Sequence, residues 1–548
     1  MKLKSEETVY CDVLVIGGGG AGLRSAIAAR LRGADVLLIS KSRVGYSTNT
    51  FISKAVIAAT GWGTSEDRDV VHLADTVKGG RFLNDQAMAA KVAEQAHSEI
   101  AFLMECGVRF GMEKGKPGLM HTPGHRYPRH VYGENWIGSD LVFPIKRRAK
   151  EEGVRFIEQA FVTRLLATED LITGATAVTK DGMFLTIQAK AVILATGGYA
   201  QIFLNTNNVP GITGDGQALC YDLGVPLKDM EFIQFYPTAT GKRGNRILLY
   251  ERFLALPEVV LRNRDGEDIL ERHGFSDLMR LTRDQLAQLI MKEIIDGGTL
   301  NNEVIMDLEA LSEDKARQLT QILPSPWWKG QKTYEVAPTV HFCMGGIVTD
   351  HSGETSVPGL FAVGEATAGV HGANRLGGNA LAEIFVMGSL VGKNVGECVT
   401  DMEPAFSPKE IIEEEKSRLE GAFSVKGSNP KHMIQELKKL MWQKAGVIRK
   451  KNELEEALVR IQDSWPRASI VNPADLINQL EFENMRMVAE MVCSAALKRT
   501  ESRGSHFRVD HPQEDNEWLK NIVLRKGVSG MEFEMRPVRL DLVKPELD

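Results

Sequence analysis

The chain has 548 residues, of which 43% are hydrophobic and 25% charged, and its formal net charge is −6. A chain of this length is expected to form three or four structural units around a large buried core. The slightly negative net charge argues against nucleic acid or an anionic membrane surface as a partner.

The six cysteines are scattered singly, without a C-x-x-C pair. Neither a zinc site nor a cysteine-held iron–sulfur cluster can therefore be built locally, and we predict no metal site. Residues 1–10 lack an apolar signal segment, and the most apolar later stretch, Leu376–Gly392, is interrupted by Asn379 and Glu383. Without a membrane span, we expect a cytoplasmic protein, or one held at the inner face of a membrane through a partner.

The first predicted unit is a strand, a helix and a second strand. Cys11–Ile16 is a short β-branched run, typical of a buried parallel strand. After Gly17–Gly22, the segment Leu23–Leu31 has helical spacing, and Ala34–Ser40 is again a strand. These elements make one βαβ unit.

The turn between the first strand and the helix fits G-x-G-x-x-G. Gly17 permits a tight turn, Gly19 lets the backbone approach a pyrophosphate, and Gly22 allows close helix–strand packing. Gly20 and Ala21 lie in the same turn, and the N-terminus of the helix that follows favours phosphate. The turn predicts a dinucleotide site.

Three further observations select FAD among the dinucleotides. The second strand ends in Ser40 and Lys41, where an NAD site usually carries an acidic residue. Two later strands close in glycine-rich turns, Ala195–Gly198 and Gly359–Glu365, of the kind that approach a flavin nucleotide. Glu365 is placed to hold a ribose or ribityl hydroxyl. We therefore predict an FAD-binding chain.

The predicted architecture is an α/β FAD-binding, Rossmann-like domain that is interrupted by an α+β capping domain and followed by a helical domain. Residues 1–234 and 340–403 form the FAD-binding domain, and residues 235–339 the capping domain, with a helix over Asp277–Ile295. Residues 404–520 form an up-down helical bundle, and residues 521–548 a C-terminal extension with a strand over Phe533–Leu542. The expected helices of the bundle are Pro408–Leu419, His432–Lys450, Glu453–Ser464 and Pro473–Arg499.

Long motifs along the chain carry a family resemblance. They are D-T-V-K-G-G (Asp75–Gly80), T-G-D-G (Thr213–Gly216), D-M-E-F-I-Q-F-Y-P-T (Asp229–Thr238), H-F-C-M-G-G-I (His341–Ile347), H-G-A-N-R-L-G-G-N (His371–Asn379) and E-S-R-G-S-H (Glu501–His506). With these motifs the chain resembles the flavoprotein subunit of the succinate dehydrogenase and fumarate reductase family, to which L-aspartate oxidase also belongs.

The resemblance implies hydride exchange between FAD and a C–C or C–N bond beside a carboxylate. His341 matches the family's histidine that binds a substrate carboxylate, and Arg375 matches the arginine that clamps it. Arg283, in L-T-R-D, lies where the family carries its proton-donating arginine. Glu251 matches an acidic residue of the substrate and proton-relay region.

The motifs and the resemblance together give the expected FAD contacts. They are Gly17, Gly19, Gly20, Ala21, Gly22, Ser40, Lys41, Ser47, Thr48, Ala195, Thr196, Gly197, Asp215, Gly364, Glu365, Arg375, Asn379, Ala380 and Leu381.

The sequence departs from the family at the covalent flavin link. Many members bond FAD to the histidine of an S-H-T segment, which reads Ser47-Thr48-Asn49 here. No histidine precedes His72. We therefore expect noncovalent FAD with a lowered potential, which favours reductase chemistry over succinate oxidation.

The substrate side departs as well. The family's Q-x-H-P-T has Tyr236 in place of its histidine, and its T-E pair reads Tyr250-Glu251. The arginine and glycine-rich continuation is replaced by Phe253–Pro257, so the usual relay arginine is missing unless Arg252 substitutes. A small dicarboxylate and a carboxylate with one apolar end are both open as substrates. The expected pocket residues are Tyr236, Thr238, Tyr250, Glu251, His341 and Arg375.

The carboxyl-terminal part favours a multisubunit enzyme. The helical domain, Glu501–His506 and Asp515–Lys520 resemble dehydrogenase and reductase subunits more than aspartate oxidases. An iron–sulfur subunit, with further electron-transfer or membrane subunits behind it, is then the expected electron route. Two alternatives are a stand-alone oxidase of the aspartate oxidase kind and a flavin electron-transfer subunit whose substrate pocket is silent.

Overall fold

The computed structural model describes residues 3–168, 171–241, 247–249, 256, 258–275, 281–297, 303–312, 314–315 and 332–545.

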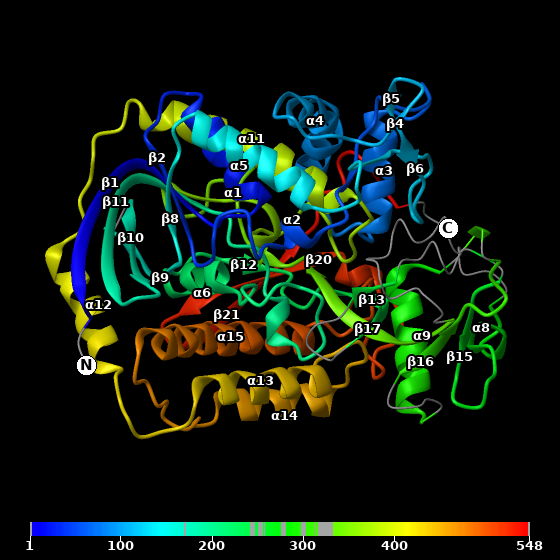
Figure 1. Cartoon of the computed structure of the whole chain (residues 1–548). Helices are drawn as coiled ribbons and strands as arrows, with labels where there is room; N and C mark the ends of the chain where they lie inside the picture. The colour runs from blue at the N-terminus through cyan, green and yellow to red at the C-terminus, as the bar shows by residue number, and fades with distance from the viewer. Residues whose placement is uncertain are drawn as a thin grey trace.

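A seven-stranded sheet lies at the centre of the amino-terminal part (Figure 1). Its order is β8-β2-β1-β11-β10-β9, and β19 pairs with β11 as well. The strands are β1 (Ser5–Ile16), β2 (Val36–Ser40), β8 (Arg155–Glu158), β9 (Ala160–Ala167), β10 (Ile172–Thr179), β11 (Met183–Leu194) and β19 (Leu360–Ala362). β8, β2, β1, β11 and β19 pair in parallel, while β10 and β9 add an antiparallel edge.

The three strands that were predicted to end in glycine-rich turns are neighbours in this sheet. Ile16 at the end of β1 is paired in register with Leu194 of β11, and Leu194 with Ala362 of β19. The turns that follow therefore start at the same level of the sheet. The carboxyl end of a parallel sheet is where such folds bind nucleotides.

Close helix packing covers one face of the sheet. α1 (Gly20–Arg30) lies against α11 (Asn379–Val399), as Figure 1 shows. Three glycines at four-residue spacing, Gly388, Gly392 and Gly396, face α1, and a Cβ at Gly392 would lie 2.3 Å from the Ser25 carbonyl oxygen. Because these glycines have no side chains, the backbones of α1 and α11 can approach closely. This contact places the start of α11 beside the glycine-rich turns.

The predicted capping domain is built on a second sheet, of order β14-β13-β17-β16-β15. Its elements are β13 (Ile233–Thr240), β14 (Ile247–Leu248), β15 (Val260–Arg262), α8 (Ile269–Arg272), α9 (Arg283–Ile295), β16 (Val304–Asp307) and β17 (Thr333–Cys343). Leu261, Ile290 and Val336 belong to a separate hydrophobic core here. The expected boundaries, 235 and 339, fall inside the paired strands β13 and β17, so the two domains are joined by a continuous two-stranded ribbon.

The predicted helix over 277–295 begins at Arg283 as α9, because Thr282 caps it together with Gln285 in a capping box. Residues 276–280 lie outside the described part of the chain.

The carboxyl-terminal helices form a packed group of three rather than four. α13 (Pro430–Lys444), α14 (Lys451–Gln462) and α15 (Pro473–Lys498) pack on one another below the sheet (Figure 1). α12 (Lys409–Gly421) lies apart, beside β1 and β9, where it buries Ile412 and Leu419 and where Lys416 pairs with Glu6 and Glu414 with Arg164. Within the described residues no helix, α15 included, is long and apolar enough to cross a membrane.

The C-terminal extension belongs to a sheet that it shares with the FAD-binding segments. β20 (Lys520–Gly527) and β21 (Gly530–Pro537) form a hairpin whose first strand pairs with β12 (Leu227–Lys228), which in turn pairs with β18 (Gly346–Ile347). The strand expected over 533–542 ends at Pro537.

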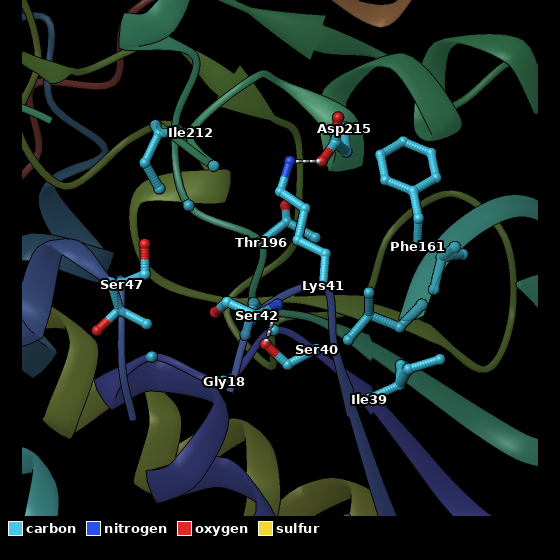
Figure 2. Close-up of a pocket in the computed structure, with 18 of the residues that line it drawn as sticks. Gly18, Ile39, Ser40, Lys41, Ser42, Ser47, Phe161, Thr196, Ile212 and Asp215 are labelled. Carbon is cyan, nitrogen blue, oxygen red and sulfur yellow. Dashed lines mark hydrogen bonds and ion pairs between the residues drawn. The ribbon is translucent and has the colours of Figure 1, made fainter. Parts of the chain in front are cut away.

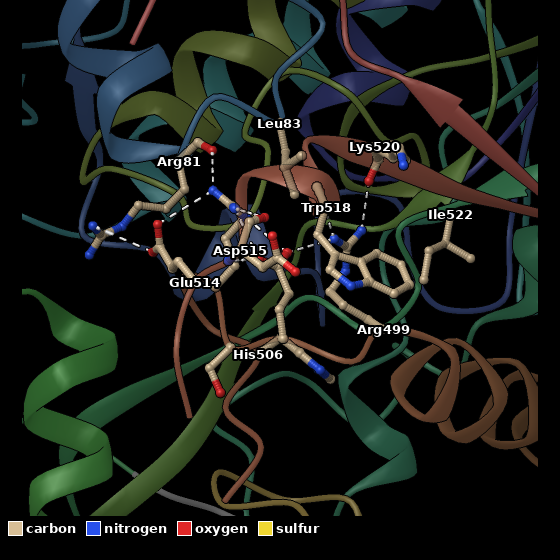
Figure 3. Close-up of polar contacts among 12 residues, drawn as sticks. Arg81, Leu83, Arg499, His506, Glu514, Asp515, Trp518, Lys520 and Ile522 are labelled. Atoms are coloured by element: carbon tan, nitrogen blue, oxygen red, sulfur yellow. Dashed lines mark hydrogen bonds and ion pairs between the residues drawn. The ribbon is translucent and has the colours of Figure 1, made fainter. Parts of the chain in front are cut away.

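The E-S-R-G-S-H segment stabilises this junction through buried ion pairs. Arg499 donates through Nε to Glu231 (2.6 Å) and through Nη1 to Glu501 (2.9 Å), and all three side chains are fully buried. Figure 3 shows the Arg499 guanidinium beside the Trp518 ring and the backbone carbonyl of Lys520, to which it donates at 2.9 Å. The cluster ties the end of α15 to the start of β20.

Candidate active site

The turn between β1 and α1 has the backbone that the sequence predicts. Gly17 has φ of 125°, and a Cβ there would lie 2.1 Å from the Ala195 carbonyl oxygen, while one at Gly22 would lie 2.0 Å from the oxygen of Gly17. Only glycine fits at these two positions. A Cβ at Gly19, the N-cap of α1, would meet no atom nearer than 3.7 Å, so the backbone there borders open space.

A cavity of about 840 Å³, here called the cofactor cavity, opens beside this turn (Figure 2). Thr196 Oγ1 lies on its wall, buried and without a hydrogen-bond partner among the described residues, as a ligand-facing hydroxyl would be. The open glycine backbone and this hydroxyl fit FAD. The predicted contacts that line the cavity are Gly17, Gly19, Gly20, Ala21, Ser40, Lys41, Ser47, Thr48, Ala195, Thr196, Gly197, Asp215 and Glu365.

Six predicted contacts do not line this cavity. Gly22 and Gly364 are packing positions, since a Cβ at Gly364 would lie 3.0 Å from Ala21 Cβ. Asn379 is buried and used internally, bonding His72 Nε2 and Thr76 Oγ1 at 2.9 Å each. The other three predicted contacts line an adjoining cavity instead: Arg375, Ala380 and Leu381.

Lys41 is the charged centre of one end of the cofactor cavity. Its ammonium donates to Asp215 (2.6 Å), Thr213 (2.6 Å) and Glu481 (2.9 Å). Figure 2 shows the side chain reaching from the end of β2 toward Asp215, near Phe161. Burial alone would lower the Lys41 pKa, but the Asp215 and Glu481 carboxylates outweigh burial and raise it. Lys41 is therefore a fixed cation.

The sequence did not indicate that the helical domain reaches the cofactor. Ala474, Ile477, Asn478 and Glu481, all on α15, line the cofactor cavity. These positions form no local motif, and only the packing of α15 beside the sheet brings them there. Asn49 and Thr50, at the start of α2 (Asn49–Ile52), were missed too; Thr50 Oγ1 accepts the Gly20 amide at 3.1 Å.

A second cavity, of about 510 Å³, adjoins the first and is called the substrate cavity below. Asn49, Thr50, Glu365 and Ile384 line both cavities. Four residues predicted for catalysis or substrate binding meet on its wall: Tyr236, Arg283, His341 and Arg375. They come from β13, the start of α9, β17 and the loop before α11.

Arg375 is held rigidly at this wall. Its Nη2 donates to Gln234 Oε1 at 2.9 Å, while Gln234 Nε2 donates back to the Arg375 carbonyl oxygen at 2.8 Å. The guanidinium lies 4.6 Å from the centre of the Phe342 ring. A buried guanidinium fixed in this way is ready to bind a carboxylate.

His341 and Arg283 contact the aromatic residue that replaces the family's histidine. The rings of Tyr236 and His341 lie 5.5 Å apart, edge to face, and the Arg283 guanidinium lies 5.1 Å from the Tyr236 ring centre. His341 Nδ1 is 3.2 Å from Asn207 Oδ1. Burial of His341, and to a smaller extent the positive charges of Arg375 and Arg283, holds the pKa of its imidazole well below the usual 6.5. The imidazole is therefore neutral before an anion binds.

Glu365 stands between the two cavities. Its Oε1 accepts the Cys343 amide at 3.1 Å, and its Oε2 accepts from Asn49 Nδ2 at 3.3 Å. Burial raises its pKa to about 7. The position fits the predicted bond to a ribityl or ribose hydroxyl.

Other predicted pocket residues are not on the described wall. Thr238 is fully buried, does not line the substrate cavity, and donates its hydroxyl to the Leu249 carbonyl oxygen at 2.6 Å. Tyr250 and Glu251 lie outside the described residues, as do Arg252 and most of the segment 253–257.

Comparison with known proteins identifies the family of the chain. An FAD binding domain family model matches residues 12–381, and a fumarate reductase flavoprotein C-terminal model matches residues 434–547. The chain is 34% identical to an uncharacterized FAD-dependent oxidoreductase of Methanocaldococcus jannaschii (94% of this chain, 96% of the relative). It is 32% identical to one subunit of the fumarate reductase (CoM/CoB) of Methanothermobacter marburgensis (95% and 98%).

A solved structure confirms the predicted fold class. E. coli quinol fumarate reductase FrdA superposes with a TM-score of 0.90 at 27% identity, over 99% of each chain. The predicted order of an FAD-binding domain, a capping domain and a helical domain is thus correct. The chain therefore belongs to the flavoprotein family of succinate dehydrogenase and fumarate reductase, and it is an FAD-dependent oxidoreductase of that type.

Proposed function

We propose that the chain is the flavoprotein subunit of a fumarate reductase-like or succinate dehydrogenase-like enzyme that acts on a small carboxylate. The single observation that supports this proposal most is the meeting of Arg283, His341 and Arg375 on a cavity that shares its wall with the cofactor cavity. A carboxylate held there would place its neighbouring carbon–carbon bond beside the flavin.

We assign each of these residues a role, from its contacts for Arg375 and His341 and from the family resemblance for Arg283. Arg375, fixed by Gln234, binds the carboxylate, and His341 supports it once the anion has raised the imidazole pKa. Arg283 holds the proton that one carbon of a double bond takes during reduction. Because a free guanidinium has a pKa above about 12, this transfer requires a closed, water-poor site. FAD, when bound, supplies the hydride exchange with the other carbon.

We further propose that FAD is held noncovalently. Thr48 stands in the family's histidine segment and caps α2, where its Oγ1 accepts the Phe51 amide at 3.1 Å. Among the described residues that line the cofactor cavity there is neither histidine nor cysteine.

An iron–sulfur subunit is the proposed electron route. A cluster of aromatic and aliphatic side chains, here called the apolar patch, comprises Tyr46, Phe51, Ile52, Ile137 and Phe143. All but Phe51 are at least 39% exposed, and the rings of Tyr46, Phe51 and Phe143 lie within 5.8 Å of one another. Tyr46 also lines the cofactor cavity and Ile52 the substrate cavity. Such a patch is typical of a protein–protein interface.

Turnover with an artificial electron donor tests the proposal. We expect the purified, FAD-loaded chain to oxidise reduced viologen dye when an unsaturated carboxylate such as fumarate or crotonate is added. Absence of turnover with every such carboxylate would refute it. Rapid peroxide formation without a partner would instead favour an oxidase of the aspartate oxidase kind.

A further inference from the structure

A chain of hydrogen bonds runs along the wall between the two cavities and ends on His341. It begins at Glu365, whose Oε2 accepts from Asn49 Nδ2 at 3.3 Å, and Asn49 Nδ2 also donates to Asn208 Oδ1. Asn208 Nδ2 donates to the His341 carbonyl oxygen at 3.0 Å, and Asn207 Oδ1 lies 3.2 Å from His341 Nδ1. All three asparagines line the substrate cavity, and no motif predicted them as site residues.

Backbone groups at both ends of this chain fix the orientation of its amides. The Val209 N–H can only donate, and it donates to Asn49 Oδ1 at 3.3 Å, so Asn49 turns its NH2 group toward Asn208 Oδ1. The His341 carbonyl oxygen can only accept, so Asn208 turns its NH2 group toward it and toward Asn207 Oδ1, at 3.4 Å. Asn207 therefore presents an oxygen, not an NH2 group, to the imidazole.

This orientation decides which nitrogen of the neutral imidazole carries the proton. Because Asn207 Oδ1 can only accept, Nδ1 of His341 is the N–H nitrogen and Nε2 is the acceptor. Within the described part of the chain the ring makes this one hydrogen bond, and His341 lines the substrate cavity, so Nε2 is left for a ligand. The lone pair on Nε2 repels a carboxylate. The ring can bind the anion only after Nε2 has taken up a proton.

The segment that carries Asn207 is tied to the strand that carries His341. The Asn207 amide donates to the Val340 carbonyl oxygen at 3.2 Å, and the Val340 amide donates to the Asn205 carbonyl oxygen at 2.9 Å. Gln201 Nε2 donates to the carbonyl oxygen of Asn208 at 2.7 Å. The Asn207 oxygen is thus held in place beside the imidazole by the paired backbone.

The charges around the ring keep it neutral until an anion arrives. Burial and the positive charges of Arg375 and Arg283 disfavour the imidazolium of His341. A bound carboxylate adds a negative charge beside the ring and reverses this balance. The titratable side chains among the described lining residues of the cavity are Lys54, His121, Tyr236, Arg283, Glu365 and Arg375.

We propose that Asn207 is a positioning residue that keeps the proton of neutral His341 on Nδ1, so that each carboxylate binds together with one proton from solvent, which goes to Nε2. The inference rests on the proposed function, because it assumes that His341 supports the substrate carboxylate. No bond to carbon changes in this step: a proton moves from solvent to Nε2, and an ion pair forms. The affinity for the carboxylate should therefore fall as the pH rises.

Proton uptake on binding of fumarate to the oxidised, FAD-loaded protein tests the proposal without turnover. Oxidised flavin has no electrons to give, so fumarate is unreactive, and calorimetry in buffers of different ionisation enthalpy counts the protons bound. We expect uptake of about one proton per fumarate near neutral pH, and a dissociation constant that rises by up to about tenfold per pH unit. A ring protonated on Nε2 would bind the carboxylate without uptake. Fumarate binding with no proton uptake would therefore overturn the proposal.

Three variants locate the proton. His341→Gln, whose amide is a neutral donor, should bind fumarate without uptake. Asn207→Asp places a carboxylate at Nδ1 and stabilises the imidazolium before the ligand arrives, so uptake should fall well below that of the wild type and the pH dependence should flatten. Asn452→Asp, exposed on α14, makes the same substitution away from the cavity and should keep the uptake of the wild type.

The outcomes separate this inference from the proposed function. Uptake that persists in His341→Gln, or that is the same in Asn207→Asp as in the wild type, would overturn the inference and leave the proposed function intact if the wild type still reduces fumarate. The wild type and His341→Gln decide the tautomer even if Asn207→Asp does not fold. If the wild type turns over crotonate but not fumarate, crotonate is the probe. A wild type that binds neither and turns over no carboxylate would overturn both.

Discussion

Lys41, at the end of the second strand of the central sheet, forms a 2.9 Å ion pair with Glu481 on α15, some 440 residues later in the chain. The pair joins the cofactor cavity to the helical domain.

We expect Glu481→Gln to weaken both FAD binding and the folded state. Because Lys41 still pairs with Asp215 in the variant, the free energies of FAD binding and of unfolding should each change by about 1–3 kcal/mol, which is less than if Lys41 lost both carboxylates. The FAD dissociation constant and the thermal midpoint measure these changes. Glu483→Gln, half-exposed on the same helix, is the control, and equal effects of the two variants would contradict a specific role for the Lys41 pair.

Denaturation should release the flavin. Because Thr48 replaces the histidine of the covalent link, acid precipitation of the purified protein is expected to leave all FAD in the supernatant, where its absorbance is read. A pellet that stays yellow after washing would show a covalent bond. Reconstitution of the released apoprotein with free FAD provides the positive control.

Arg283→Ala should abolish most of the catalysis while sparing FAD binding. A positioned proton donor contributes about 100-fold or more to the rate, and Arg283 lines the substrate cavity but not the cofactor cavity. The measurement is kcat with reduced viologen and fumarate, alongside the flavin content. Rescue by Arg283→Lys would be incomplete, since an ammonium lacks the planar fork of a guanidinium. Full activity in the alanine variant would exclude Arg283 as the proton donor.

The stability of the protein should depend on pH through Asp229. Burial, and then the nearby Glu231, raises the Asp229 pKa from 3.8 to about 7. The folded state then binds this proton more tightly than the unfolded state. The proton's contribution is fully present below about pH 4 and is lost as the pH rises through 7.

Asp229→Asn, which suits the left-handed φ of 59° at this position, should remove that dependence. The free energy of unfolding of the wild type, relative to the variant, should fall by roughly 2–4 kcal/mol between pH 4 and 7. Urea titrations of the FAD-loaded proteins at several pH values measure it. If the free energies of unfolding of the two proteins changed with pH in the same way, Asp229 would have an ordinary pKa in the folded state.

If the proposed iron–sulfur partner binds at the apolar patch, Phe143→Glu should weaken that association and leave turnover with artificial donors unchanged. The side chain is 39% exposed in the apolar patch, and a charge there would be desolvated in an interface. Val528→Glu, fully exposed in the turn between β20 and β21, is the control. Co-purification and viologen turnover measure the two effects. Undiminished partner binding would place the interface elsewhere.

The sequence predicted well what depends on local chemistry. Turn geometry and helical periodicity depend on residues that are close together in the sequence. For this reason the sequence predicted the glycine turn at Gly17, the parallel strands on either side of it, and the helices from 430 onward. His341 and Arg375 were found because long motifs carry them, whereas Arg283 was assigned from the short L-T-R-D; all three line the substrate cavity.

Contacts that depend on tertiary packing could not be predicted. The wall that α15 contributes to the cofactor cavity and the pairing of β20 with β12 have no local signature. α12 buries Ile412 and Leu419 and pairs with Glu6 and Arg164, which lie far away in the sequence. Thr238 was expected in the pocket because of its motif, yet its hydroxyl donates to the backbone carbonyl of Leu249, just after β14.

The cofactor cavity is lined by segments from both ends of the chain, and this affects how its site forms during synthesis. The glycine turn leaves the ribosome first, but β1 must wait for β11 to emerge before it has its long partner, and the cavity lacks one wall until α15 follows. Such late, long-range pairing slows folding. A nascent chain therefore completes its flavin site only near the end of its own synthesis, and a chain cut short before residue 473 would carry the dinucleotide motif without a finished site.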